Sequence, residues 1–108
     1  MPVALFVVRA TITKDKEAAF NKWYNEEHVP QVLQYNGAVS GRRYKRIMGD
    51  DKYEYMAVYE FASEEVFRKF QQSDHLKALR GVRQALRRRV GANGDGLDAG
   101  VSVAAAPS

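Results

Sequence analysis

The sequence contains no cysteine, only three prolines and a single tryptophan among 108 residues. Without cysteine there can be no disulfide, no thiolate metal site and no cysteine nucleophile, which argues against a disulfide-stapled secreted module. The longest apolar run, Val3 to Val8, is far shorter than the roughly 18 residues that a membrane helix needs, and no signal-peptide pattern is present. We therefore expect a cytoplasmic protein with no membrane partner.

The composition is that of one folded domain. Hydrophobic residues make up 45% of the chain and charged residues 28%, which excludes global disorder and collagen-like repeats. Much of the net charge of +4 comes from five arginines between Arg80 and Arg89. Such a cluster can contact an acidic partner or RNA, but it is more often a solvated surface, so the sequence does not favour nucleic acid as a partner.

Hydrophobic patterning and capping residues predict alternating strands and helices. In chain order these are a strand over 3–13, a helix over 14–28, strands over 38–48 and 53–61, and a helix that begins after Ser63. Residues 83–90 fit a last strand or a helix equally well. Residues 91–108 are rich in glycine and alanine, which predicts a flexible tail after a domain of residues 1–90.

This order predicts an α+β fold of the ferredoxin-like type, a four-stranded antiparallel sheet with two helices on one face. The strand over 53–61 carries large apolar side chains on both faces, with Tyr55 and Tyr59 on one and Met56 and Val58 on the other. A monomer would expose the face without helices, and an apolar patch of that kind marks an interface or a ligand site. We therefore predict a homodimer that pairs through the sheet.

The first predicted helix carries aromatic and ionisable residues at the spacing of an inward-facing stripe. These residues are Phe20, Trp23, Tyr24, Glu27 and His28. A carboxylate near an imidazole can tune it toward neutral pH, as a general acid or base requires. The alternative is that the helix frays after Asn25, so that both ionisable groups meet solvent.

The second histidine, His75, follows the second predicted helix. Antiparallel helices would place His28 and His75 at opposite ends of the sheet, which argues against a dyad within one chain. Two separated histidines without a third ligand do not favour a metal site. Because phosphate-binding loops and serine nucleophile elbows are also absent from the sequence, we expect neither a metal nor another cofactor.

Several segments together suggest a family. They are Phe20-x-x-Trp23, Glu27-His28-Val29-Pro30, Gly37 with Arg43-Tyr44, the run 55–61, and Ser73-Asp74-His75. Over about residues 3–90 the chain resembles the EthD-like family of the dimeric α/β-barrel superfamily. The resemblance implies a homodimer whose sheets form a barrel, with a small-molecule pocket in each subunit. Members of the superfamily include lactone isomerases, polyketide cyclases and dehydratases, monooxygenases that need no metal or flavin, and accessory proteins.

The resemblance also implies roles for the two histidines. The histidine of the family's His-x-Pro segment falls on His28, and a histidine that is catalytic in some polyketide cyclases falls on His75. Phe70 stands where those cyclases have an assisting tyrosine, which weakens a mechanism centred on His75 and leaves it as a substrate-binding candidate.

Our leading hypothesis is a cofactor-independent isomerase, dehydratase or lyase that acts on a small aromatic, polyketide-like or lactone substrate by proton transfer. His28 would be the general acid or base, Glu27 would orient it, and Tyr44 or Tyr55 would donate a hydrogen bond to the developing enolate. The pocket walls would be Trp23, Tyr24 and Phe67, each of which is also an ordinary core residue. Two alternatives stay open, a cofactor-free monooxygenase of phenols and a non-catalytic dimeric accessory or ligand-binding protein.

Overall fold

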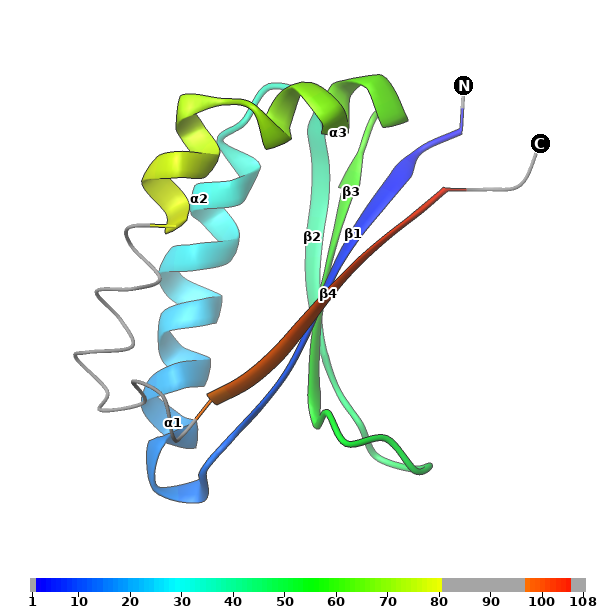
Figure 1. The fold of residues 1–108 in the computed structure, drawn as a ribbon. Coiled ribbons are helices and arrows are strands. Elements are labelled where there is room, and N and C mark those ends of the chain that lie inside the picture. The colour runs from blue at the N-terminus through cyan, green and yellow to red at the C-terminus, as the bar shows by residue number, and fades with distance from the viewer. Residues whose placement is uncertain (1, 81–96, 106–108) are drawn as a thin grey trace.

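The computed structural model describes residues 2–80 and 97–105. They form a four-stranded antiparallel sheet with the strand order β2-β3-β1-β4. The described helices lie on one side of this sheet and across one end of it (Figure 1). This arrangement is the ferredoxin-like sandwich, so the predicted fold class is confirmed.

The two central strands build the core because alternate side chains point toward the helices. β1 (Ala4–Ile12) and β3 (Tyr55–Phe61) are antiparallel, with Val7 opposite Val58. β2 (Ala38–Lys45) pairs with the outer edge of β3, and its register shifts at a bulge between Ala38 and Ser40. The largest fully buried side chains are Tyr59, Phe20, Phe61, Phe70 and Val32.

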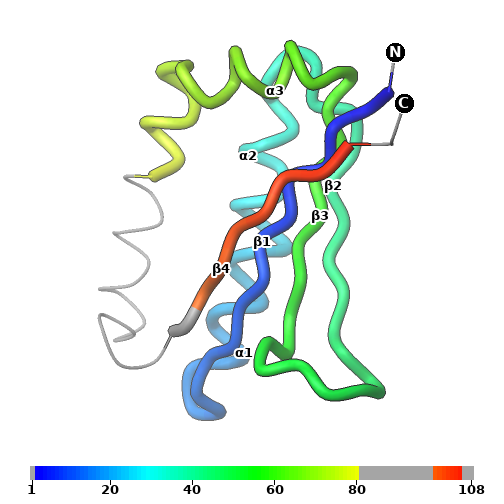
Figure 2. The backbone as a smooth tube through the Cα atoms, turned by 45° about the vertical axis from the view of Figure 1, so that its right-hand side comes forward, coloured from blue at the N-terminus to red at the C-terminus, as the bar shows by residue number. Residues whose placement is uncertain are grey.

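The fourth strand corrects a prediction. β4 (Leu97–Ala105) pairs with β1 along its whole length, with Val101 opposite Val8, and Figure 2 shows it beside β1. The expectation of a flexible tail is therefore wrong for residues 97–105, because pairing with a central strand outweighs the low strand propensity of alanine and glycine. The candidate strand over 83–90 lies outside the described residues.

The first helical region is one continuous run of three parts. α1 (Lys14–Trp23) is followed by the π-helical turn η1 (Tyr24–His28) and then by α2 (Val29–Leu33). The sequence predicted that this helix ends at residue 28. The structure instead has a π turn just before this point, and the helical run continues through Pro30.

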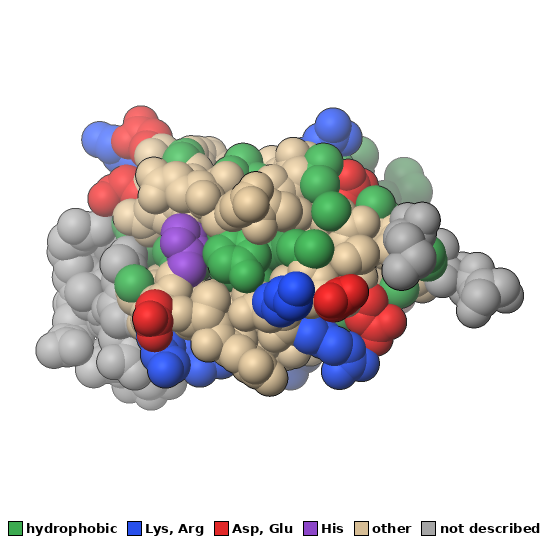
Figure 3. Space-filling view, turned by 90° about the horizontal axis from the view of Figure 1, so that it is seen from above, with side chains coloured by type: hydrophobic (Ala, Val, Ile, Leu, Met, Phe, Trp, Pro, Cys, Tyr) green, Lys and Arg blue, Asp and Glu red, His purple; other side chains and the backbone are tan. Residues whose placement is uncertain are grey.

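The second helical region begins where the sequence predicted it. The backbone N–H of Val66 donates to Ser63 Oγ at 3.2 Å, which caps α3 (Glu64–Gln71). Ser73 Oγ accepts a hydrogen bond from the Leu76 N–H at 3.1 Å, and the chain is helical again over 74–80. Figure 3 looks onto this end of the molecule and shows basic and acidic side chains side by side on its surface.

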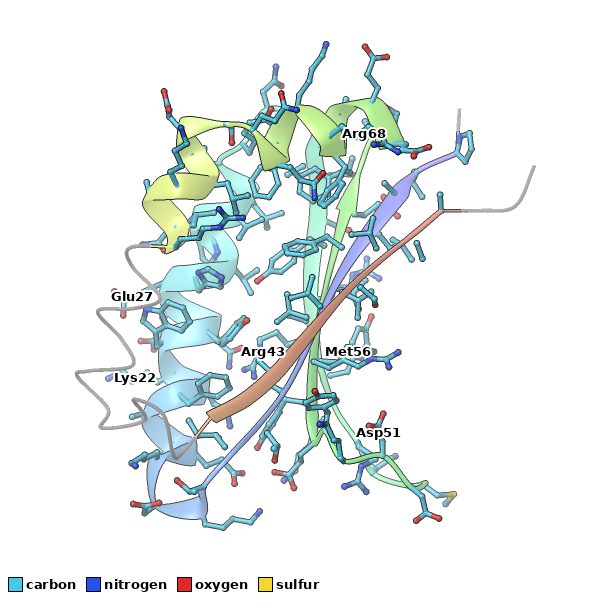
Figure 4. All side chains as sticks on the ribbon, in the orientation of Figure 1. Lys22, Glu27, Arg43, Asp51, Met56 and Arg68 are labelled. Atoms are coloured by element: carbon cyan, nitrogen blue, oxygen red, sulfur yellow. The ribbon has the colours of Figure 1, made fainter. Side chains whose placement is uncertain are left out.

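The other face of the sheet has no helix over it in the described part of the chain (Figure 1). Val7 is almost fully buried, whereas Leu5, Met56 and Val58 are partly exposed. Met56 points to this side, away from the helices (Figure 4). No helix among residues 2–80 is long and apolar enough to cross a membrane.

Candidate active site

The π turn brings His28 to the inside of the molecule. The backbone N–H of Val29 donates to the carbonyl of Tyr24, five residues earlier, which is the hydrogen bond that defines a π turn. The π turn contains one residue more than an α-helical turn. The residues after it therefore point about 100° away from the direction that they would have on an uninterrupted α-helix. As a result Phe20, Tyr24, His28 and Val32, spaced four residues apart, are all buried.

The His28 imidazole lies against aromatic rings. Its centroid is 4.5 Å from that of Trp23, and the two planes are inclined by 16°, so the rings are stacked. The Tyr24 ring meets it edge-on at 5.0 Å, and the Tyr59 ring does so at 6.5 Å. With only 4% of its surface exposed, His28 is held in a fixed orientation by these contacts.

His28 also lines a cavity of about 330 Å³ between the helices and the sheet. Its walls are apolar except for His28, Gln71 and Arg80; they comprise Phe6, Val8, Val32, Phe67, Phe70, Leu76, Leu79 and Val101. Gln71 and Arg80 are exposed whereas His28 is buried, so the imidazole lies deep in the cavity and the other two polar groups lie at its mouth. The volume falls at the lower end of the range for small-molecule sites.

Three of the predicted pocket residues surround this cavity or the imidazole. Phe67 is part of the cavity wall. Trp23 and Tyr24 contact the His28 ring and support it from outside the lining. Glu27 is exposed on the side of the helix that faces away from the sheet (Figure 4). The prediction that Glu27 faces the core is therefore wrong, because the π turn breaks the α-helical spacing on which it was based.

The two tyrosine candidates lie away from the His28 cavity. Tyr44 is 48% exposed and belongs to the open face of the sheet, opposite Met56, so its expected hydrogen bond to a substrate beside His28 is not supported. Tyr55 is on the helix side, but its hydroxyl donates to Glu17 Oε1 at 2.5 Å and accepts from Asn21 Nδ2 at 3.1 Å. Tyr55 thus serves a separate polar cluster near the start of α1.

His75 also stands outside the cavity lining. Its Nε2 is 2.7 Å from the backbone carbonyl oxygen of Gln31, and its ring lies 5.7 Å from that of Tyr35. Because Gln31 follows His28 by one helical turn, the two histidines are at the same end of the sheet, and the expectation of opposite ends is wrong. The helical segment over 74–80 packs against α2 instead of running along α1 (Figure 1).

The polar cluster includes a residue that sequence reasoning did not select, Arg43 of β2. Its guanidinium lies between the helix and the sheet (Figure 4), 4.6 Å from the centroid of the Tyr24 ring. It donates to Asn21 Oδ1 at 2.9 Å and to Asn25 Oδ1 at 3.1 Å. Burial lowers the pKa of Arg43, and the neighbouring tyrosines act in the opposite direction, but a guanidinium stays protonated at physiological pH.

Metal ligands do not gather in the described part of the chain. Among residues 2–80 and 97–105 there is no group of three or more histidine, aspartate or glutamate side chains that could hold an ion.

Comparison with protein-family models identifies the family of this chain. The family model described as "Domain of unknown function (DUF4286)" matches residues 3–93. The chain belongs to this family. A search of curated proteins finds no significant match for this DUF4286 protein.

Solved structures share its fold. An EthD family protein from Bacillus halodurans is 18% identical with a TM-score of 0.61, covering 94% of the DUF4286 chain and 97% of its own. A variant of SnoaB from Streptomyces nogalater, described as a cofactor-independent oxygenase, is 16% identical with a TM-score of 0.62, covering 98% and 94%. A DABB family protein with a ferredoxin-like fold from Mesorhizobium loti is 10% identical with a TM-score of 0.68, covering 100% of both chains. The resemblance to EthD-like proteins is thus confirmed at the level of the fold.

Proposed function

We propose that this DUF4286 protein is a cofactor-independent enzyme that acts on a small aromatic, polyketide-like or lactone substrate by proton transfer through His28. The observation that carries the proposal is the position of a buried imidazole deep in an otherwise largely apolar cavity. A neutral imidazole accepts a proton and its cation returns it, which are the two halves of general acid–base catalysis.

The surroundings of His28 suit this task. Removing a proton from carbon beside a carbonyl, or from a phenol, leaves an anion next to an imidazolium. The attraction between these charges is stronger in an apolar cavity than in water. The face of Trp23, stacked on His28, keeps the imidazole in one orientation while it takes up and returns the proton.

The substrate anion has two possible fates. Return of the proton to another carbon completes an isomerisation, and loss of a leaving group completes a dehydration or another lyase reaction. Reaction of the anion with dioxygen instead converts a CH₂ group and O₂ into a ketone and water, which balances without another reductant. The oxygenase alternative is supported by the fold shared with SnoaB, which is described as a cofactor-independent oxygenase.

A turnover assay with matched variants tests the proposal. Purified protein would be mixed with 1-naphthol, an anthrone, a 1,3-diketone and an unsaturated lactone, in air and under argon, with no cofactor added. We expect turnover of at least one probe and a loss of about 10²–10⁴-fold in His28→Gln. The control is His75→Gln, because His75 lies outside the cavity lining.

The same assay separates the alternatives. Turnover that needs air identifies an oxygenase, and turnover that persists under argon identifies an isomerase or lyase. Binding of a probe without turnover, unchanged in His28→Gln, would instead indicate an accessory or ligand-binding protein. That result would overturn the proposed role of His28.

We also propose that the protein is a homodimer that pairs through the open face of the sheet. Leu5, Met56 and Val58 are partly exposed on this face, and a second copy would bury them. Sedimentation should give a dimer that Val58→Glu converts to monomer, since the substitution places a charge in the interface. A wild-type monomer at micromolar concentration would contradict the proposal.

A further inference from the structure

Arg43 connects the sheet to the helix at the point where the helix changes from α to π geometry. Its two hydrogen bonds reach Asn21, in α1, and Asn25, in η1. Its guanidinium also lies over the Tyr24 ring, the first residue of η1. One side chain of β2 therefore holds residues on both sides of the junction.

A π turn needs such support because it is a rare geometry. If η1 became an ordinary α-helix, every residue after the lost insertion would rotate by about 100° around the helix axis. His28 is the last residue of η1, so the rotation would move its imidazole off the Trp23 face and out of the cavity.

The contacts of Arg43 suit a fixed clamp. A guanidinium is planar, and its N–H groups form a rigid fork, so stacking on Tyr24 and bonding both asparagines determine one orientation. Lys45 and Glu17, which face the same groove from β2 and α1, are paired at 3.9 Å. The side-chain hydrogen bonds of Arg43 within the described residues go to the neutral amides of Asn21 and Asn25.

We propose that Arg43 is a positioning residue that holds the η1 turn and thereby keeps His28 stacked on Trp23 and directed into the cavity. It does not touch the cavity itself, because it is not among the lining residues. The effect on turnover rests on the proposed function, whereas the effect on the His28 ring does not.

NMR of the His28 ring protons tests the clamp directly. A proton above an aromatic face experiences a ring-current shift, so the Trp23 stack gives His28 a signature that depends on its position. The variant Arg43→Met retains an apolar stem but loses the fork. Asn25→Ala removes one tether inside η1 and leaves the stack on Tyr24, which provides a second test if Arg43→Met does not fold.

Two controls separate positioning from general stability. Arg42→Met changes the neighbouring arginine, which is exposed on the opposite face of β2. Tyr55→Phe removes the hydrogen bonds of the Tyr55 hydroxyl to Glu17 and Asn21. It leaves the contacts of Arg43 with Asn25 and Tyr24 in η1, so it should lower the melting temperature and leave the His28 signals in place.

We expect the His28 signals to lose their ring-current shift in Arg43→Met and to move partly in Asn25→Ala and Arg43→Lys. If a substrate is found, kcat should fall by about 10²-fold in Arg43→Met, the usual effect of misplacing a reacting group. The proposal fails if the His28 signals of Arg43→Met match the wild type, or if Tyr55→Phe moves them equally. If the His28 signals shift in Arg43→Met but the wild-type protein turns over none of the probes, the positioning role of Arg43 stands and the proposed enzymatic function is rejected.

Discussion

Trp23 and His28 are five residues apart, yet their rings stack with centroids separated by 4.5 Å. On a regular α-helix, residues at this spacing point about 140° apart and cannot stack. The π turn between them closes that angle. The stack is therefore a direct consequence of the π turn, and it directs Glu27 to the outside of the helix.

The position of Glu27 leads to a first prediction. Because its side chain is exposed on the far side of the helix, Glu27→Gln should leave the His28 ring-proton signals in place and change any turnover by less than about twofold. Its effect on stability should stay within the range of about 0–1 kcal/mol that is typical of surface charges. A tenfold loss of turnover with intact folding would show that Glu27 acts on His28 after all.

The sequence predicted the site correctly where the backbone geometry is regular. It failed at the π turn η1 and at the bulge in β2. The aromatic stripe correctly predicted that His28 faces the inside. The same α-helical spacing gave the wrong side for Glu27, because no residue pattern indicates the π turn. In β2, regular alternation from the inward-facing Ala38 would point Tyr44 inward as well. The bulge between Ala38 and Ser40 shifts the register, so Arg43 faces the helix and Tyr44 faces outward.

The fold was predictable where strands are rich in aromatic and β-branched residues, as in β1 and β3. The last strand was missed because the run 97–105 consists mainly of small residues. One signal was present, since Ala99, Val101 and Val103 alternate with Gly100 and Ser102. Five residues of alternation among small side chains do not by themselves predict a strand. The strand forms because each of these residues pairs with a residue of β1.

Glu17 gives a prediction about pH. The hydroxyl of Tyr55, with Lys14 second, lowers the pKa of Glu17 below its ordinary value of 4.5. The folded state therefore favours the ionised carboxylate, and its contribution to stability is present above pH 4.5 and lost as the pH falls through the lowered pKa.

The melting temperature should accordingly fall less steeply between about pH 5 and 3 in Glu17→Gln and in Tyr55→Phe than in the wild type. In the Glu17→Gln background, adding Tyr55→Phe should change this slope little, because the two residues act through one hydrogen bond. Equal slopes in wild type and Glu17→Gln would refute the coupling. Thermal unfolding followed by circular dichroism provides the measurement.

Two glycines with similar backbone angles differ in their surroundings. Gly37 has φ of 104° and Gly49 has φ of 102°, where alanine is strained. A Cβ at Gly37 would collide with Val66 Cγ1, whereas a Cβ at Gly49 would meet nothing within 4 Å. We expect Gly49→Ala to cost about 1 kcal/mol and Gly37→Ala about 3 kcal/mol, as strain and overpacking combine. Urea unfolding measures both, and similar losses would mean that Val66 yields easily.

The last prediction concerns β4, which lies beyond the residues that the family model matches. That match ends at residue 93, yet β4 supplies one of the two hydrogen-bonded neighbours of β1. A chain that ends at residue 93 would leave this edge of β1 unpaired and remove Ala99 from the core. We expect it to lose its cooperative thermal transition, because a small domain has only about 5–15 kcal/mol of stability to lose.

A chain that ends at residue 105 is the matched control, since it retains the whole of β4 and should melt like the full protein. If the chain ending at residue 93 also keeps its cooperative transition, either an earlier segment pairs with β1 in place of β4 or the domain folds with this edge of β1 bare. The candidate segment is the run 83–90, whose pattern fits a strand. Amide hydrogen exchange at Val8 and the other β1 positions would then distinguish a replaced strand, which protects these amides, from a bare edge, which does not.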